Sequence, residues 1–397
     1  MNFRSFFVAL SRIFWLQTIT AQAPVLSAKS ASERFALTLT SALGVQSPAQ
    51  NIIISPLLVQ AILTLLSYGA NDEEAATLHA ALYLPQPERK QIATLNMAQL
   101  LSAAKARAQR GAHLLSGIYV QEHMMFKFHE EFLDMAKHFE TPVEMVDFKR
   151  KTIDELNYYF LKESNYTCGE VLNLELAALQ ERFVLATAAV FHAPWAVGFN
   201  VKETEKLNFF TDRVHHKLVE SMFVTHKFRY AELTHLDAKL VELPYANNTS
   251  LKLWLLLPNE LDGLLNMEAK LQHENLLELE KLLNEQKMVL TLPKFRAQYS
   301  VDLKEALSAL GFARIFNGET KFPHMFSSFF NSRSPTVTNV PHKAFWRVHE
   351  AGGSASVDQF SFGGLFRHPM QLVVNHPFYF LIKSDVEVLL AGHIVNV

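Results

Sequence analysis

Few residue patterns in this chain could carry out chemistry. The segment "HEEFL", residues 129–133, begins like the helix of a zinc protease, in which two histidines one helical turn apart bind the metal. Leu133 occupies the position where the second histidine would be needed, so no metal site is expected. The polar residues of this helix are instead expected to face solvent; they are His129, Glu130, Asp134 and His138. The chain also lacks GxGxxG, GxxxxGK[ST], GxSxG and CxxC motifs, so neither an enzyme nor a cofactor is indicated.

A different kind of candidate lies near the C-terminal end. Residues 349–369, "HEAGGSASVDQFSFGGLFRHP", are rich in Gly, Ser and Ala with single aromatic residues, and strand-like segments flank them on both sides. Such a segment can neither pack a core nor form a confident helix. Because long loops without secondary structure are usually functional in compact domains, we expect the functional residues to lie in this loop.

The composition is that of a globular protein with a large core. Of 397 residues, 49% are hydrophobic and 19% are charged, and the formal net charge is −2. Near-neutral charge argues against a nucleic-acid-binding function. No linker, repeat or charge block divides the chain, and no apolar run after the N-terminal segment is long enough to span a membrane. The single cysteine, Cys168, excludes an intramolecular disulfide framework and is expected to be a free thiol.

The first 23 residues are typical of a secretory signal peptide. Arg4 precedes an apolar run, and the tripeptide "AQA" ending at Ala23 is a small-residue cleavage pattern. Arg12 interrupts the run, so an ordinary N-terminal helix is the alternative. Three N-glycosylation sequons suit secretion; they lie at Asn165, Asn247 and Asn248. The last two overlap in a polar turn, so only one of that pair is expected to be modified.

Helix and strand signals are mixed along the chain, with helices dominating early and strands later. Residues 52–54 form a short apolar strand, after which Ser55 offers an N-cap and Pro56 a first-turn residue for an apolar helix. Asn71 followed by Glu74 indicates the start of the next helix. From about residue 183 strand signals dominate. We therefore expect an α+β fold with several long strands around one core.

A loose basic set follows a helical stretch; it comprises Lys105, Arg107 and Arg110. An exposed helix end is the favoured interpretation, and a glycosaminoglycan site is the alternative.

Over roughly residues 30 to 396, the chain resembles the serpin family. The matching segments occur in the family's order; among them are "NIIISPLLVQAILTLLSYGA", "FVLATAAVFHAPWAVGF", "LTLPKF", "PHKAFWRVHEAGG" and "NHPFYFLI". The second segment contains a tryptophan that the family places near the top of its main sheet, here Trp195. The resemblance implies a serpin-like α+β fold, with multi-strand sheets surrounded by helices and an exposed reactive-centre loop at about residues 350–369.

The resemblance also implies a mechanism. In serpins this loop is bait for a serine protease, whose serine attacks it and forms an acyl-enzyme. The cut loop then inserts as a new central strand of the main sheet, and the attached protease is dragged away and distorted. The implied hinge residues are Glu350, Gly352, Gly353, Ser354, Ala355, Ser356 and Val357.

Insertion requires one face of the new strand to be small and uncharged, because alternate side chains face opposite sides of a sheet. If Glu350 begins the hinge, the inward set is Gly353, Ala355, Val357, Gln359, Ser361 and Gly363. The outward set is then Ser354, Ser356, Asp358, Phe360 and Phe362. A slip of one residue would turn Asp358 inward, so the sequence permits insertion in one register.

The loop length predicts the bait bond. From Gly352 to Pro377 is 25 positions, the family's usual spacing, which places the scissile bond after Phe366. Phe366 suits a chymotrypsin-like protease. Arg367 would suit a trypsin-like protease, but it requires a loop one residue longer than usual. The remaining alternative is a flexible loop tip with no target protease.

Several residues depart from the family pattern. Gly353 stands where Thr or Ser is typical, and Val357 and Asp358 interrupt an alanine stretch, changes that would slow insertion. His342 matches the buried histidine of the family's shutter region, to which Ser55 also belongs, but Leu58 and Thr187 replace the expected Ser and Asn. Thr187 could still offer a hydroxyl. Without a partner, buried His342 would cost about 1–3 kcal/mol.

The sequence therefore predicts a secreted, monomeric serpin-like protein with one domain, residues 24–397, that acts on an extracellular serine protease. The alternative is a non-inhibitory serpin that serves as a carrier, storage protein or folding factor. Hinge behaviour distinguishes the two, because an inhibitor must gain thermal stability when its loop is cut and a carrier need not.

Overall fold

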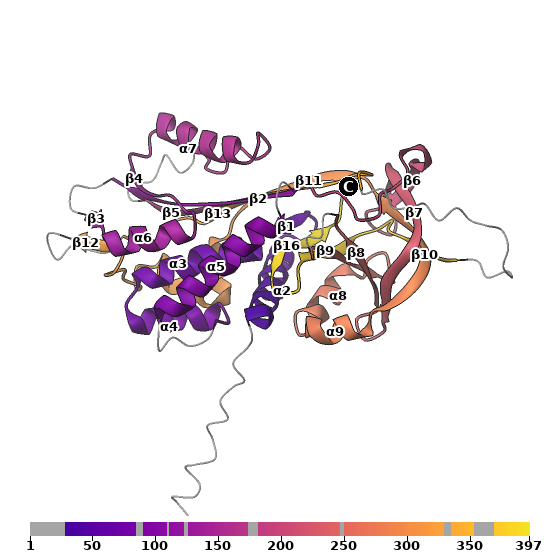
Figure 1. Cartoon of the computed structure of the whole chain (residues 1–397), viewed down its shortest axis with the longest axis horizontal. Coiled ribbons are helices and arrows are strands. Elements are labelled where there is room, and N and C mark those ends of the chain that lie inside the picture. The colour runs from indigo at the N-terminus through magenta and orange to yellow at the C-terminus, as the bar shows by residue number, and fades with distance from the viewer. Residues whose placement is uncertain are drawn as a thin grey trace, which may run out of the picture.

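The computed structural model describes residues 28–84, 90–108, 111–122, 126–173, 182–246, 250–328, 335–352 and 369–397. They form a mixture of helices and sheets that confirms the expected α+β class (Figure 1). The helices are α2 (Ala28–Gln46), α3 (Pro56–Gly69), α4 (Asp72–Ala81), α5 (Lys90–Ala108), α6 (Glu130–His138), α7 (Arg150–Glu163), α8 (Leu264–Leu271), α9 (Leu276–Leu282), α10 (Lys304–Leu307) and α11 (Ala313–Phe316). Short 3₁₀ and π turns lie at Val201–Glu203 and Ser308–Phe312.

Within the described residues, the strands form two large sheets and one short ribbon. The first sheet, called the main sheet below, has the order β11 (Phe295–Asp302), β13 (Pro341–Val348), β5 (Phe183–Phe191), β2 (Ala112–Gln121) and β4 (Val143–Val146). The second has the order β1 (Ile52–Ile54), β16 (Val388–Ile394), β15 (Phe378–Lys383), β9 (Lys252–Pro258), β8 (Ala238–Pro244), β7 (His216–Leu233), β10 (Asn284–Pro293) and β14 (Met370–Val373), with β6 (Glu205–Phe210) paired to β7. The ribbon pairs β12 (Phe326–Ser328) with β3 (Phe126–Phe128).

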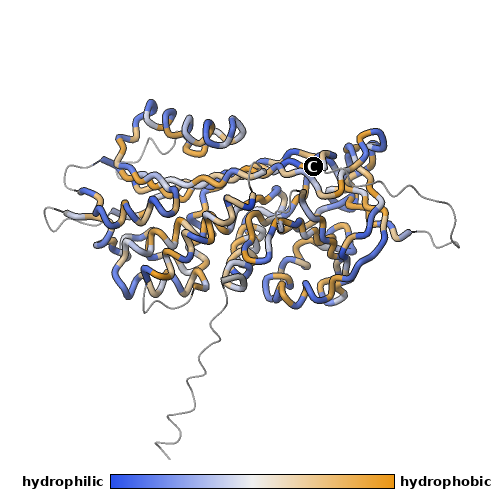
Figure 2. Tube along the Cα trace, in the orientation of Figure 1, coloured by the Kyte–Doolittle hydropathy of each residue, from blue (hydrophilic) through white to orange (hydrophobic). Residues whose placement is uncertain are grey.

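β5 lies inside the main sheet because every residue of "FVLATAAVF" can be buried on either face. Leu185 and Phe191 face the large core that also contains α3 and α5 side chains. Val184 and Val190 face the opposite side, called the outer face below, where they pack in a cluster with Phe160 of α7. Figure 1 shows α7 on one side of this sheet and α3, α5 and α6 on the other. In Figure 2 the helices alternate between hydrophobic and hydrophilic residues, as expected for elements with one packed face.

Both predicted helix starts are confirmed. Ser55 has an extended backbone, and its hydroxyl accepts a hydrogen bond from the N–H of Leu58, with Pro56 in the first turn of α3. The Asn71 side chain accepts from the N–H of Glu74 at 2.9 Å and caps α4. These caps fix where α3 and α4 begin, and Ser55 therefore lies between β1 and α3.

The segment that begins "HEEFL" forms helix α6, with His129 immediately before it. Glu130, Asp134 and His138 are exposed, as predicted, and Asp134 pairs with Lys137 at 2.7 Å. In the part of the chain that the structure describes, no group of three or more His, Cys, Asp or Glu residues could hold a metal ion.

Candidate functional site

The candidate site is the seam between β5 and β13, where the two strands run parallel. His342 pairs with Thr187 and Trp346 pairs with Phe191 in this register. An isolated parallel bridge between Trp195 and Gly352 lies beyond the ends of both strands; its partner numbers differ by 157, whereas those within the strands differ by 155. The seam is therefore closed along its length in this structure. A strand could enter between β5 and β13 only after these pairs separated.

His342 joins three elements at the seam. The backbone N–H of Ser55 donates to Nε2 of His342 at 3.1 Å, so Nε2 is an acceptor and the ring proton is on Nδ1. Nδ1 then donates to the Thr187 hydroxyl at 2.8 Å, which places β13 against β5 and both against the start of α3. Burial lowers the pKa of His342 to about 3, so the ring is neutral at physiological pH.

His342 keeps its hydrogen-bond partners although the residue types around it differ from the family pattern. Thr187 supplies the hydroxyl acceptor, and the main chain of Ser55 supplies the donor. Leu58 takes part only through its backbone, which donates to the Ser55 side chain at 3.4 Å. The altered residue types therefore keep both ring nitrogens of His342 hydrogen-bonded.

Trp195 fixes the chain as it leaves the top of β13. Its indole N–H donates to the carbonyl oxygen of His349 at 2.8 Å, and its backbone N–H donates to that of Ala351 at 3.0 Å. The indole also stacks on Tyr245, with ring centroids 4.7 Å apart. Trp195, which the family resemblance implies is near the top of the main sheet, thus binds the carbonyl groups of His349 and Ala351.

Glu350 is the second anchor of the hinge. Its side chain is buried and accepts hydrogen bonds from Lys294 and from the hydroxyl of Thr204, each at 3.1 Å. Its carbonyl oxygen accepts from the N–H of Phe199. Burial acts to raise the pKa of Glu350, but its own backbone N–H and the Lys294 ammonium outweigh that effect and leave the pKa below its ordinary value. The carboxylate is therefore ionised and held in place.

Gly352 lies where the hinge chain touches the segment after β5. A Cβ atom on Gly352 would lie 2.3 Å from the Cα of Gly198, which is far inside van der Waals contact. Only glycine allows the two backbones to approach so closely. The bridge between Gly352 and Trp195 depends on this contact.

Several predicted site residues lie outside the described residues. These are the hinge residues Gly353, Ser354, Ala355, Ser356 and Val357, the bait residues Phe366 and Arg367, the sequons at Asn247 and Asn248, and the N-terminal segment 1–23. Asn165 is described: it is exposed in the turn after α7, with a φ of 53°. Cys168 is free and buried, and burial raises the pKa of its thiol to about 11.

The described members of the basic set lie in the last turn of α5 and are engaged in ion pairs. Lys105 contacts Glu140 at 2.8 Å, and Arg107 makes two contacts with the buried carboxylate of Glu387. Their side chains are only 20% and 28% exposed, so the expected exposed helix end is wrong for both. Paired, half-buried cations offer little to a glycosaminoglycan. Arg110 lies outside the described residues.

Three contributors to the site were missed from the sequence: Lys294, Thr204 and Gly198. They lie 56 to 154 positions from the hinge residues that they contact. No local pattern marks them. Only the pairing of the strands brings them to the top of the seam.

Comparison with known proteins identifies the class. Residues 30–397 match the family model of the serpins, described as serine protease inhibitors. The chain therefore belongs to the serpin family. It is 28% identical to human Serpin B3, over 86% of this chain and 91% of that protein, and 24% identical to Antichymotrypsin-2 of Bombyx mori, over 92% and 96%.

Solved structures agree. Serpin48 of the insect Tenebrio molitor superposes with a TM-score of 0.78 at 25% identity, covering 93% of this chain and 98% of that one. Uncleaved ovalbumin superposes with a TM-score of 0.80 at 22% identity, covering 94% and 100%, which shows the shared fold alone. Among the described residues, no helix is long and apolar enough to cross a membrane.

Proposed function

We propose that this serpin inhibits a serine protease as a suicide substrate, with residues 353–368 as the bait. The observation that carries the proposal is the anchoring of residues 349–352 at the top of the closed seam by Trp195 and Glu350. A loop fixed at that point starts beside the end of β5, because Gly352 bridges to Trp195. After cleavage, the freed loop could turn back and run down between β5 and β13, antiparallel to both strands. The protein thus acts as an inhibitor and not as an enzyme.

The bait bond that we propose is Phe366–Arg367, which suits a chymotrypsin-like protease, with Arg367–His368 and a trypsin-like protease as the alternative. The Bombyx mori relatives named Antichymotrypsin-2 and Antitrypsin show that both kinds of name occur among the relatives of this chain. The signal-like segment 1–23 and the exposed sequon at Asn165 support secretion as an extracellular, monomeric glycoprotein.

The test is incubation of the purified protein with chymotrypsin and, separately, with trypsin. We expect a protease complex that survives denaturing electrophoresis and a released peptide whose mass begins at Arg367. A start at His368 would move the bait residue to Arg367. Phe366→Ala is the informative variant, and Phe362→Ala is its matched control in the same loop. Cleavage without a complex and without a gain in thermal stability would refute inhibition.

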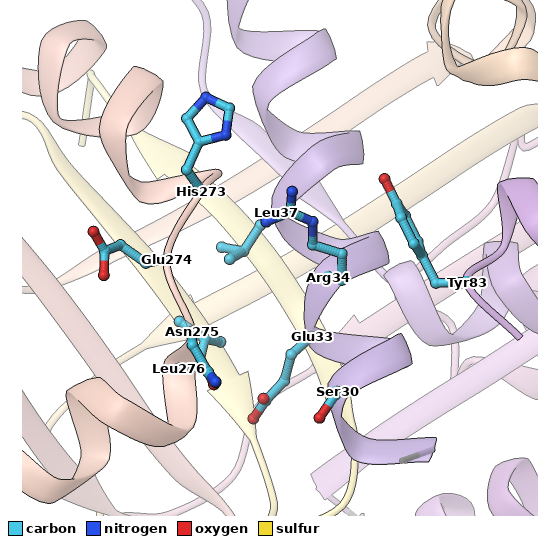
Figure 3. Close-up of a pocket in the computed structure, with 9 residues that line it drawn as sticks. All are labelled: Ser30, Glu33, Arg34, Leu37, Tyr83, His273, Glu274, Asn275 and Leu276. Carbon is cyan, nitrogen blue, oxygen red and sulfur yellow. The ribbon is translucent and has the colours of Figure 1, made fainter. Parts of the chain in front are cut away.

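A carrier function is the second candidate, because one pocket favours it. A cavity of about 250 Å³ opens between α2 and the turn that joins α8 to α9 (Figure 3). Leu37, Tyr83 and Leu276 give it apolar walls. Its charged groups are already engaged, since Glu33 binds Lys383 at 2.8 Å and Arg34 donates to the carbonyl oxygen of Gln272 at 2.8 Å. A fluorescent apolar probe that binds the wild type and not Leu37→Trp would support this function.

A further inference from the structure

A row of basic residues crosses the outer face of the main sheet. Arg296 of β11 is directly opposite Arg347 of β13, so both point to one face. Val190 of β5, an outer-face residue, is opposite His113 of β2, and His192 lies two positions after Val190 on the same face. We call Arg296, Arg347, His192 and His113 the basic row. It spans four strands and crosses the seam between β13 and β5.

The members of the basic row contact or face one another. The rings of His113 and His192 stack with centroids 6.4 Å apart. Burial lowers the pKa of His192, and the positive fields of His113 and Arg347 lower it further. Arg296 is exposed, and the other three are half-buried. Phosphate- or sulfate-sized ligands could therefore reach the row.

No carboxylate neutralises the basic row among the residues that the structure describes, because none of its four members forms an ion pair there. Glu350, a carboxylate that follows Arg347 in the chain, is bound by Lys294 and Thr204. His349, which follows Arg347 on this face, also carries a buried Nδ1 without a hydrogen-bond partner. The row is therefore a site of unbalanced positive charge.

This arrangement costs stability in the absence of a ligand. Like charges directly opposite one another in a sheet are destabilising, and Arg296 and Arg347 occupy such positions. A metal ion is not the missing partner, because guanidinium groups are always protonated and do not bind cations. The described part of the chain also holds no cluster of metal-binding residues. The natural counterpart is an anion.

A helix packs over one end of the outer face and not over the other end in the described chain. Figure 1 shows α7 over the end of the main sheet that carries β4, while the end beyond it has no helix above it in the described chain. The basic row lies at that second end, at the same level as Trp346 and Phe191 of the seam. Side chains there are open to a ligand that lies flat on the sheet.

We propose that the basic row binds a small multivalent oxyanion, a phosphorylated or sulfated molecule that bridges β13 and β5. Guanidinium groups bind phosphate and sulfate through paired N–H donors, and the imidazole N–H groups on the other side of the seam add further donors. Adjacent strands lie about 4.8 Å apart, so four strands span about 14 Å, which suits a ligand with two or more anionic groups.

The ligand would act as a clamp on the closed sheet. A strand inserted at the seam doubles the separation of Arg347 from His192, from one strand spacing to two, roughly 5 to 10 Å. A ligand that fits the closed spacing binds the open sheet less well, and it therefore shifts the equilibrium toward the closed form. This consequence rests on the proposed function; the binding site itself does not.

Titration calorimetry tests the site. The probes are tripolyphosphate and sucrose octasulfate, which distinguish a phosphorylated from a sulfated ligand, against sodium chloride at matched ionic strength. We expect at least one probe to bind the wild type, and Arg296→Gln and Arg347→Gln each to weaken it roughly tenfold or more. Arg150→Gln, an exposed arginine on α7, is the matched control and should bind as the wild type does.

The titration with sucrose octasulfate is repeated at a lower pH. Sucrose octasulfate keeps its charge between pH 7.5 and 5.5, whereas the imidazole of His192 gains charge as the pH falls. We expect tighter binding at pH 5.5, with the gain reduced in His192→Gln. Binding of neither probe above the salt control, or equal binding by the wild type and by the Arg296→Gln/Arg347→Gln double variant, would overturn the site.

A second measurement distinguishes failure of the binding site from failure of the proposed function. The loop is cut by chymotrypsin with and without the bound probe, and the rate at which the cut protein gains thermal stability is measured. We expect the probe to slow this gain in the wild type and not in the double variant. No gain even without the probe would refute insertion, and the titration alone would then decide the site. A probe that binds at the row but leaves the rate unchanged would refute the clamp.

Discussion

Replacing Thr187 with valine tests whether the hydrogen-bonded histidine holds the seam closed. The substitution keeps the branched shape and removes only the hydroxyl that accepts from Nδ1 of His342 at 2.8 Å. The imidazole is 2% exposed, and its Nε2 is committed to Ser55. The Nδ1–H group would therefore lose its acceptor with no water to replace it. Leaving a buried donor unpaired costs about 1–3 kcal/mol.

The assay is urea unfolding followed by fluorescence. With an m-value of about 3 kcal/mol/M, a loss of 2 kcal/mol lowers the unfolding midpoint by roughly 0.7 M. Thr187→Ser is the matched control, because it keeps the hydroxyl and should retain most of the stability. A midpoint for Thr187→Val equal to that of the wild type would refute the view that this hydrogen bond stabilises the seam.

The same histidine gives the stability a pH dependence. The pKa of His342 is lowered from 6.5 to about 3 by burial, so below pH 6.5 the unfolded chain takes up a proton that the folded protein refuses. Stability therefore falls as the pH falls, by about 1.4 kcal/mol per unit and up to about 5 kcal/mol by pH 3. Between pH 6.5 and pH 5 this amounts to about 2 kcal/mol. In His342→Asn, the loss of stability due to His342 should be absent. Burial also lowers the pKa of His79 to about 4, and His79 contributes to the pH dependence in both proteins. An equal fall in both proteins would contradict the assignment.

Three further substitutions or reactions follow from the contacts. Gly352→Ala places a methyl group against the backbone of Gly198, and we expect it to separate the hinge from the seam and destabilise the protein by about 1–3 kcal/mol, measured by urea unfolding; no change would contradict the contact. Arg296→Gln removes the like-charge pair with Arg347, and we expect a gain of about 0.2–1 kcal/mol in low salt that shrinks in high salt. Cys168, with a pKa raised to about 11, should react with iodoacetamide far more slowly in the folded protein than in 8 M urea; equal rates would show that the thiol is accessible.

Local chemistry explains what could be predicted from the sequence. The caps at Ser55 and Asn71 depend on residues within three positions, and both were predicted correctly. Strand signals were predicted to dominate from about residue 183, and the run from Phe183 to Phe191 is a strand whose residue types allow burial on both faces. The family resemblance supplied the order of elements and the importance of Trp195 and His342.

Contacts between distant segments could not be predicted in the same way. No local pattern indicates that Glu350 contacts Lys294 and Thr204, because these contacts depend on how β13 lies against neighbouring chain segments. The basic row was missed for the same reason. Arg296 and His113 are isolated basic residues in the sequence, and only strand pairing places them on one face.

The contacts at the seam also indicate what sets the barrier to opening it. If a cut loop enters between β5 and β13, it offers its own N–H and C=O groups to both strands, so the lost backbone hydrogen bonds are replaced. The side-chain contacts have no such replacement. They are the bonds of His342 with Thr187 and Ser55, and those of Trp195 and Glu350 at the top. Each contributes about 0.5–1.5 kcal/mol, and 1.4 kcal/mol changes a rate tenfold. Under the proposed mechanism, a few side chains, more than the backbone hydrogen bonds of the sheet, therefore determine whether insertion outruns release of the protease.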